Sequence, residues 1–309
     1  MVHGYRRHWR QILEGTLIGV LLLCVHCSAS ADTIIDVWGN NSNLSGGDIT
    51  ERFLVNETAG TGSLTQSYVV SPLNGRGVVV VGNTMYTTQN DGGRTAQPDI
   101  FVTDVTTGQS LGVIHTPLFQ MASLAWDGSH FWTTDYFNGT NRGFQLDLAG
   151  NITKTVTFDL VSRFGPDSIE YFNGKLIVNR GSLVGIYDVY DLDGNVISAD
   201  FFHTDVNPDP FFSPDYVGLA FDGTNFLVSD IFNQRLVMFD GVTGNFIKFI
   251  DLPGTTQSGS QRALFDLSVD YLTRADITSN VPDAGSALSL FGLSTIMMAA
   301  ITAKRWRAS

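Results

Sequence analysis

A tight-turn pattern recurs along the chain at nearly constant spacing. The stretches LAWDGSHFWTTD (124–135), IEYFNGKLIVN (169–179) and LAFDGTNFLVSD (219–230) each place an Asp-Gly or Asn-Gly turn between two apolar segments, and VVVVGNTMYTTQ (78–89) follows the plan more loosely. Spacings of 46, 46 and 49 residues separate the turn glycines, which are Gly82, Gly128, Gly174 and Gly223. Because Asn-Gly and Asp-Gly favour the positive φ of tight hairpins, the pattern predicts a repeated β-hairpin.

The second half of each unit recurs as well. It reads IFVTDVTTG (100–108), FQLDLAGN (144–151), YDVYDLDGN (187–195) and VMFDGVTGN (237–245), and each copy is followed by another apolar segment. Four antiparallel strands in about 45 residues are typical of a propeller blade. We therefore predict four blades, at residues 75–117, 121–160, 167–203 and 215–252.

The two ends of the chain supply one more blade. RALFDLSVDYL (262–272) is similar to the first strand of a blade, and residues 33–70 contain segments similar to the other three strands. Such a closure pairs the two chain ends and removes open sheet edges. The prediction is an all-β, closed β-propeller of four-stranded blades, with five blades counted and six as the alternative.

The blade pattern resembles the NHL and related six-bladed propeller repeats. The resemblance is carried by stretches such as GLAFDGTNFLVSDIFNQRLVMFD (218–240), and it is good over three blades and weak over the rest. It implies a funnel with a central channel, and it implies little about chemistry.

Residues 1–31 have the organisation of a secretory signal peptide. Basic residues between positions 6 and 10 precede a short apolar run, Leu17–Val25. A small-residue cleavage site follows at Ala29-Ser30-Ala31, which predicts a mature chain beginning at Asp32. The alternative, an uncleaved anchor helix, is disfavoured because the apolar run is short for a membrane span.

The mature region lacks cysteine and is strongly acidic. Both cysteines, Cys24 and Cys27, fall in the signal peptide, which excludes disulfides, thiolate metal sites and cysteine nucleophiles further along the chain. Residues 32–280, which we assign to the propeller domain, carry 12 Lys or Arg against 28 Asp or Glu, a formal charge of −16. Nucleic acid is not an expected partner, since its phosphates require a basic face.

The C-terminal segment 281–309 has three parts. A short motif comes first, made of Val281, Pro282, Asp283, Ala284, Gly285 and Ser286. The apolar run Ala287–Thr302 would form a helix about 24 Å long, a marginal span for a bilayer core of about 30 Å. The basic residues that follow it would stay on the cytoplasmic side and leave the propeller outside.

This tail resembles the PEP-CTERM sorting signals of Gram-negative bacteria, in the variant whose motif is VPDSG. The one departure is Ala284 in place of Ser. The resemblance implies recognition by an exosortase, a membrane transpeptidase-like protease. It further implies cleavage near the motif and delivery of the propeller to the cell surface or extracellular matrix. The alternative is an ordinary C-terminal membrane anchor.

Local signatures of catalysis are missing from the sequence. The three histidines of the mature chain have neither H-x-H nor H-E-x-x-H spacing, and no G-x-S-x-G elbow or phosphate-binding loop is present. We assign no catalytic residue, no metal ligand and no cofactor. Asp135 and Asp230, at matching strand ends, are expected to cap the turns that follow them. A ring of such carboxylates holding calcium is the alternative.

The stretch FFHTDVNPDPFFSPDY (201–216) is the candidate ligand loop. It is long, proline-rich and aromatic, and its polar candidates are His203, Asp205, Asp209 and Asp215. Long connections often carry binding residues, although an aromatic plug over a blade joint is an equal alternative. Four aromatic residues could stack on sugars or fill blade interfaces: Trp126, Trp132, Phe211 and Phe212.

Two functional hypotheses follow. The first is an exported propeller, membrane-tethered before processing, with a non-catalytic binding or structural role toward polysaccharide or a surface protein. The second is a secreted metal-dependent enzyme of the lactonase or lyase kind that works in the channel. That enzyme would need two or more carboxylates and a histidine converging at one channel mouth.

Overall fold

The computed structural model describes residues 32–42, 48–71, 74–90, 99–135, 140–161, 165–181, 185–204, 216–231, 233–254 and 262–278. The chain divides into two units, Met1–Thr33 and Ile34–Ser309, and every strand belongs to the second. The predicted signal peptide before Asp32, the tail 281–309 and residues 205–215 of the candidate ligand loop lie outside the described residues.

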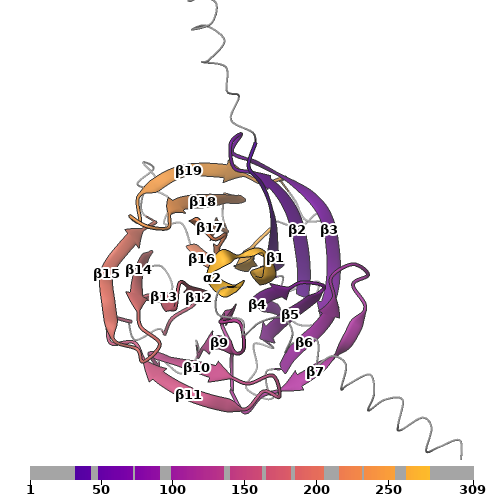
Figure 1. The fold of residues 1–309 in the computed structure, drawn as a ribbon. Helices are drawn as coiled ribbons and strands as arrows, with labels where there is room; N and C mark the ends of the chain where they lie inside the picture. Colours follow the sequence, from indigo (N-terminus) through magenta and orange to yellow (C-terminus); the bar gives the residue numbers. More distant parts are fainter. Residues whose placement is uncertain are drawn as a thin grey trace, which may run out of the picture. The chain divides into compact units, whose positions relative to one another are not determined.

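Four blades follow one another along the chain, each an antiparallel sheet with its first strand innermost (Figure 1). Blade 1 contains β4 (Asn74–Val81), β5 (Thr84–Asn90), β6 (Asp99–Asp104) and β7 (Ser110–His115). Blade 2 contains β8 (Leu124–Trp126), β9 (Phe131–Thr134), β10 (Arg142–Leu146) and β11 (Ile152–Thr157). Blade 3 contains β12 (Ile169–Phe172), β13 (Lys175–Asn179), β14 (Ile186–Tyr190) and β15 (Val196–His203). Blade 4 contains β16 (Tyr216–Phe221), β17 (Asn225–Asp230), β18 (Arg235–Asp240) and β19 (Phe246–Asp251).

The fifth blade is composite and closes the ring. Its innermost strand, β20 (Leu264–Ser268), comes from the C-terminal side, and it is followed outward by β1 (Ile34–Asn41), β2 (Asp48–Asn56) and β3 (Thr61–Ser71). β1 pairs antiparallel with both β2 and β20. A single parallel bridge between Asp251 and Thr61 joins this blade to blade 4. The predicted shared blade is confirmed, and the described residues form five blades rather than the six of the repeats that the sequence resembles.

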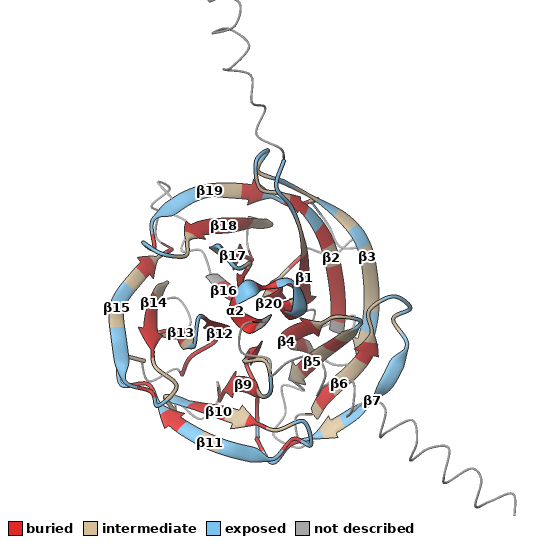
Figure 2. Ribbon diagram, in the orientation of Figure 1, coloured by how far each residue is buried: buried red, intermediate tan, exposed pale blue. Residues whose placement is uncertain are grey.

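Burial decreases from the inner strands to the outer ones (Figure 2). All four residues of β9 and of β12 are buried, whereas most of β11 and β15 is exposed or half-buried. The inner strands bury both faces because neighbouring blades flank them. Trp126 and Trp132 lie in an apolar cluster shared by blades 1, 2 and 3, which confirms that these two aromatics fill blade interfaces.

Two faces of the ring differ in how the strands are joined. We call one the turn face: it carries the hairpin turns at residues 57–60, 82–83, 105–109, 127–130, 147–151, 173–174, 191–195, 222–224 and 241–245. The opposite connection face carries the described parts of the remaining links, among them residues 116–123, 158–161, 165–168 and 252–254. Because each blade is an antiparallel meander, its turns alternate between the two faces.

Glycines in the outer turns approach the neighbouring blade closely. Gly150, Gly194 and Gly244 have φ of 87°, 87° and 71°. An added Cβ would lie 2.2, 2.7 and 1.9 Å from carbonyl oxygens of the preceding blade's outermost strand. These positions therefore require glycine for two reasons: the backbone has a positive φ, and the neighbouring carbonyl oxygen leaves no room for a Cβ atom.

The chain beyond β20 departs from the prediction. We expected strand from 262 to 272, but β20 ends at Ser268, and a 3₁₀ turn, η1 (Tyr271–Thr273), and a short helix, α2 (Ala275–Thr278), follow. Asp270 starts this turn because its side chain accepts a hydrogen bond from Leu272 N at 3.0 Å. Within the described ranges no helix is long and apolar enough to cross a membrane, and the predicted helix 287–302 lies outside them.

Candidate functional site

Residues 270–278, which we call the plug, occupy the centre of the turn face (Figure 1). The plug contacts the first hairpin of every uninterrupted blade. Asp270 accepts a hydrogen bond from Gly82 N in blade 1, and Ile277 lies beside Gly128 in blade 2. Asp276 accepts a hydrogen bond from Asn173 N in blade 3, and the guanidinium of Arg274 lies over the ring of Phe221 in blade 4. The centre of the ring is therefore covered at this face by residues 270–278 of the chain itself.

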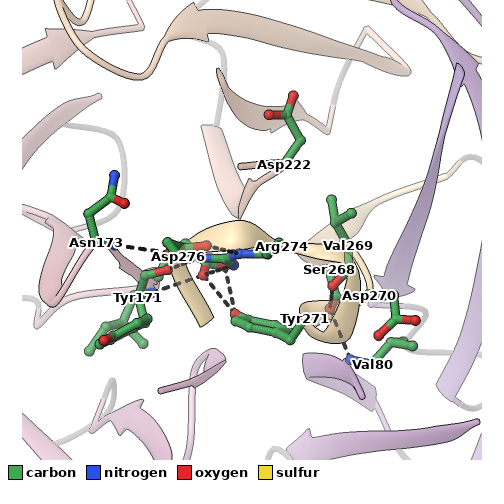
Figure 3. A network of polar contacts seen from close by, with 12 residues as sticks. Val80, Tyr171, Asn173, Asp222, Ser268, Val269, Asp270, Tyr271, Arg274 and Asp276 are labelled. Carbon is green, nitrogen blue, oxygen red and sulfur yellow. Dashed lines mark hydrogen bonds and ion pairs between the residues drawn. The ribbon is translucent and has the colours of Figure 1, made fainter. Parts of the chain in front are cut away.

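Arg274 is the centre of a buried polar network (Figure 3). Its Nη1 donates to Glu170 Oε1 at 2.7 Å, and its Nη2 lies 2.9 Å from Asp276 Oδ2. Nη2 also donates to the carbonyl of Tyr171. Tyr271 OH lies 2.7 and 2.9 Å from the two oxygens of Glu170. Glu170 belongs to β12, so the network ties the plug to blade 3.

One guanidinium serves two buried carboxylates in this network. The side chains of Arg274 and Glu170 are 0% and 1% exposed. Burial raises the pKa of Glu170 to about 7, although the neighbouring Arg274 acts in the opposite direction. Breaking a buried ion pair by removing one partner typically costs about 3–5 kcal/mol, because the other charge is left without compensation. The network therefore holds the plug in place.

A third buried carboxylate, Asp266, lies on β20, the innermost strand of the composite blade. Its Oδ2 accepts hydrogen bonds from Val78 N and Leu124 N, both at 3.0 Å, and Ser123 Oγ donates to its Oδ1 at 3.0 Å. Burial raises the pKa of this carboxyl well above its ordinary value. Asp266 thereby fastens the composite blade to blades 1 and 2, and its oxygens are engaged by the protein itself.

The histidines lie apart from these carboxylates. His115 Nδ1 is 2.9 Å from Asp99 in blade 1, and His130 lies in the β8–β9 turn, 3.6 Å from Asp127. Across the part of the chain that the structure describes, no three His, Cys, Asp or Glu side chains are grouped as metal ligands.

The two predicted turn caps have different surroundings. Asp230 Oδ1 accepts from Asn233 N at 3.1 Å, as expected for a cap, and its Oδ2 also accepts from Arg235 Nε at 3.0 Å. Asp135 is 3.7 Å from Arg142 Nη2, and the turn at 136–139 lies outside the described residues. The arginine partners were not part of the prediction.

Buried polar atoms without a hydrogen-bond partner among the described residues occur at both faces. Gln120 Oε1, Thr140 Oγ1, Gln234 Oε1 and Arg235 Nη2 lie at the connection face, and Glu57 Oε1 and Asp222 Oδ2 lie at the turn face. Gln234 and Arg235 line a narrow crevice between blade 4 and the composite blade, and Gln234 holds a φ of 53°. A buried polar atom left without a partner costs about 1–3 kcal/mol, so such atoms normally meet water or a ligand.

An ion pair closes the composite blade beside the same crevice. Arg262 Nε donates to Glu51 Oε2 at 2.6 Å, and both side chains are at most 1% exposed. Asn41 Nδ2 donates to the same carboxylate at 2.9 Å. This pair lies within one blade, whereas Arg274 reaches a different blade.

Few of the site residues chosen from the sequence lie in the described part of the chain. His203 ends β15 and is half-buried, while Asp205, Asp209 and Asp215 lie outside the described residues. Ala29, Ala31 and the six residues of the sorting motif also lie outside, and Asp32 is exposed. Sequence reasoning missed Glu170, Asp266 and Arg274, whose partners are distant along the chain.

The solved structures that are similar to this chain share little of its sequence. No family model matches the chain, and no curated protein matches it. A solved nidogen/laminin complex contains a chain that is 14% identical, with a TM-score of 0.48, covering 77% of this chain and 98% of its own. Myxococcus xanthus glutaminyl cyclase is 16% identical, with a TM-score of 0.45, and the match covers 58% of this chain and 70% of the cyclase. A Bacteroides uniformis protein with a provisional 6-phosphogluconolactonase assignment is 16% identical, with a TM-score of 0.39, covering 74% and 70%. The strand pairing of this chain itself defines it as an all-β propeller.

Proposed function

We propose that this chain is an exported propeller with a non-catalytic binding or structural role, delivered to the cell surface or matrix through its C-terminal tail. The observation that carries the proposal is the plug. Arg274 and Tyr271 engage Glu170, and backbone N–H groups with Ser123 engage Asp266. Carboxylates that already stabilise the closed ring are poorly suited to binding a metal and a substrate as well.

The connection face is the surface on which we place ligand binding. It carries the longer links between strands, and Gln234 Oε1 and Arg235 Nη2 have no hydrogen-bond partner there among the described residues. Phe119, in the link between β7 and β8, is 37% exposed there. An exposed aromatic ring beside polar side chains suits a polysaccharide or the surface of another protein.

The sorting step is tested in the native host. Replacing Pro282 and Asp283 with Ala leaves the apolar run 287–302 unchanged, so membrane insertion should persist. The parent should be recovered outside the cell without its tail, whereas the variant should accumulate uncut in the membrane fraction. Mass mapping of the C-terminus measures both. A parent that keeps residues 304–309 and stays in the membrane would show an ordinary anchor.

The binding step is tested with glycan arrays and surface-protein capture. Two variants form a matched pair: Phe119→Ser on the connection face and Val242→Ser, 84% exposed, on the turn face. We expect Phe119→Ser to weaken binding and Val242→Ser to leave it unchanged. The proposal fails if neither screen finds a ligand and the wild type instead hydrolyses lactones with an added divalent metal.

A further inference from the structure

Both ends of the propeller leave from the same face. β1 begins at Ile34, which pairs with Asn56 next to the turn at residues 57–60, so the N-terminal end lies at the turn face. The C-terminal end leaves from the plug, where Asp276 accepts a hydrogen bond from Asn173 N at 3.0 Å in the turn between β12 and β13. The first exit lies in the composite blade and the second lies at the channel axis.

The two faces are separated by the length of a strand. β17, Asn225–Asp230, has six residues, which correspond to about 20 Å at roughly 3.3 Å per residue. The apolar run begins at Ala287, so residues 279–286 are the only link to it. Eight residues reach at most about 29 Å when fully extended and cover much less as a coil. A membrane held by the tail is therefore close to the turn face.

We propose that, before the tail is cleaved, the turn face is the surface that faces the membrane, and that the connection face points away from it and is free to meet partners. This orientation rests on the proposed function, because it requires the tail to be the tether. In this orientation the lipid surface lies next to the plug and the hairpin turns.

Single cysteines in the full chain test the orientation. The chain has two cysteines, and with Cys24→Ser and Cys27→Ser an introduced cysteine becomes the only one. Thr224→Cys labels an exposed position of the turn face. Gly254→Cys labels an exposed position of the connection face, where an added Cβ meets no atom within 4 Å. Each variant carries a fluorophore and is reconstituted into vesicles of phosphatidylethanolamine and phosphatidylglycerol containing a spin-labelled lipid quencher.

We expect the label at Thr224→Cys to lose a larger fraction of its fluorescence than the label at Gly254→Cys. A second pair, Ala149→Cys on the turn face and Phe119→Cys on the connection face, guards against a variant that fails to fold. A Gly-Ser segment inserted after Ser279 should reduce the difference, because a longer tether allows the body to turn.

Two failures are distinguishable. If the protein does not float with the vesicles, the tail is no tether, and the proposed delivery and the orientation are both overturned. If it floats with the vesicles but the two labels are quenched equally, or the order is reversed, the orientation alone is overturned. Equal melting temperatures for the labelled and unlabelled proteins confirm that the comparison concerns folded molecules.

Discussion

The turn face and the connection face are made by the same five blades, yet they are stabilised differently. On the turn face, short hairpins pack against neighbouring blades, and the plug brings Arg274 to Glu170 of blade 3. On the connection face, the buried Arg262–Glu51 pair lies within the composite blade. The difference is that the buried ion pair of the turn face joins the C-terminal side of the chain to another blade, whereas the buried ion pair of the connection face stays within one blade.

The largest expected effect is the loss of the plug's ion pair. Arg274→Met leaves Glu170 and Asp276 buried without their shared cation, so unfolding free energy should fall by about 3–5 kcal/mol. Arg52→Met is the control, because the Arg52–Asp36 pair is 31% and 38% exposed and such pairs contribute up to about 1 kcal/mol. Urea denaturation measures both. Equal losses would mean that the plug does not stabilise the turn face.

Adding Glu170→Gln to Arg274→Met refines this test. It removes one of the two unpaired carboxylates, so the double variant should recover part of the lost stability. A double variant less stable than Arg274→Met would show that Glu170 has a second stabilising role, such as its hydrogen bonds with Tyr271.

A pair of glycines compares the two faces directly. Gly244→Ala on the turn face should cost at least about 2 kcal/mol, since a left-handed residue costs roughly 1–2 kcal/mol and the methyl group also meets Phe201 O. Gly254→Ala on the connection face should change stability by no more than about 0.5 kcal/mol. Thermal and urea unfolding provide the measurement. Similar values for the two would show that the outer turns are not tightly packed.

The caps on the connection face should have a smaller effect. Asp230→Asn and Asp135→Asn should each lower stability by about 0.5–2 kcal/mol, the usual range for a lost side-chain cap. Added calcium should leave the melting temperature of the parent unchanged. A calcium-dependent melting temperature that these substitutions abolish would favour a metal-binding role instead.

The last comparison concerns pH at the turn face. Burial and the neighbouring Asp222 raise the pKa of Glu57 to about 8, and Lys248 opposes them. In the unfolded chain this carboxyl returns to about 4.3. Between these two pKa values the folded chain holds a proton on Glu57 that the unfolded chain has lost. The stabilisation from this protonated carboxyl is therefore complete below about pH 4, and it is lost as pH rises through 8. Glu57→Gln should therefore flatten the decline in stability between pH 5 and 8, measured by urea denaturation at several pH values. An unchanged slope would show that Glu57 does not titrate in this range.

Much of the architecture could be predicted because it depends on local sequence. Turn glycines such as Gly128 and Gly174 mark hairpins through the positive φ that they adopt, and their spacing gives the length of a blade. The shared blade was predictable from the same logic, since the strands near the two ends complete one repeat.

The plug could not be predicted in the same way. The segment FDLSVDYL matches an inner strand up to Ser268, and the only local indication of a change is that Tyr271, not glycine, follows Asp270. The partner of Arg274 is 104 residues away, so no local pattern connects them. The contacts of Gly244 and Gly150 with the preceding blade are also tertiary, although the turns themselves were expected.

The plug has a mechanical consequence for a protein held by its C-terminus. A pull on the chain beyond Thr278 reaches α2 first, and from there it passes through Asp276 to Asn173 in blade 3 and through Arg274 to Glu170. The force is therefore applied at the axis of the ring and is shared by two contacts with blade 3. Without this arrangement it would peel β20 from β1 one hydrogen bond at a time, which is the weakest geometry for a β-strand under load.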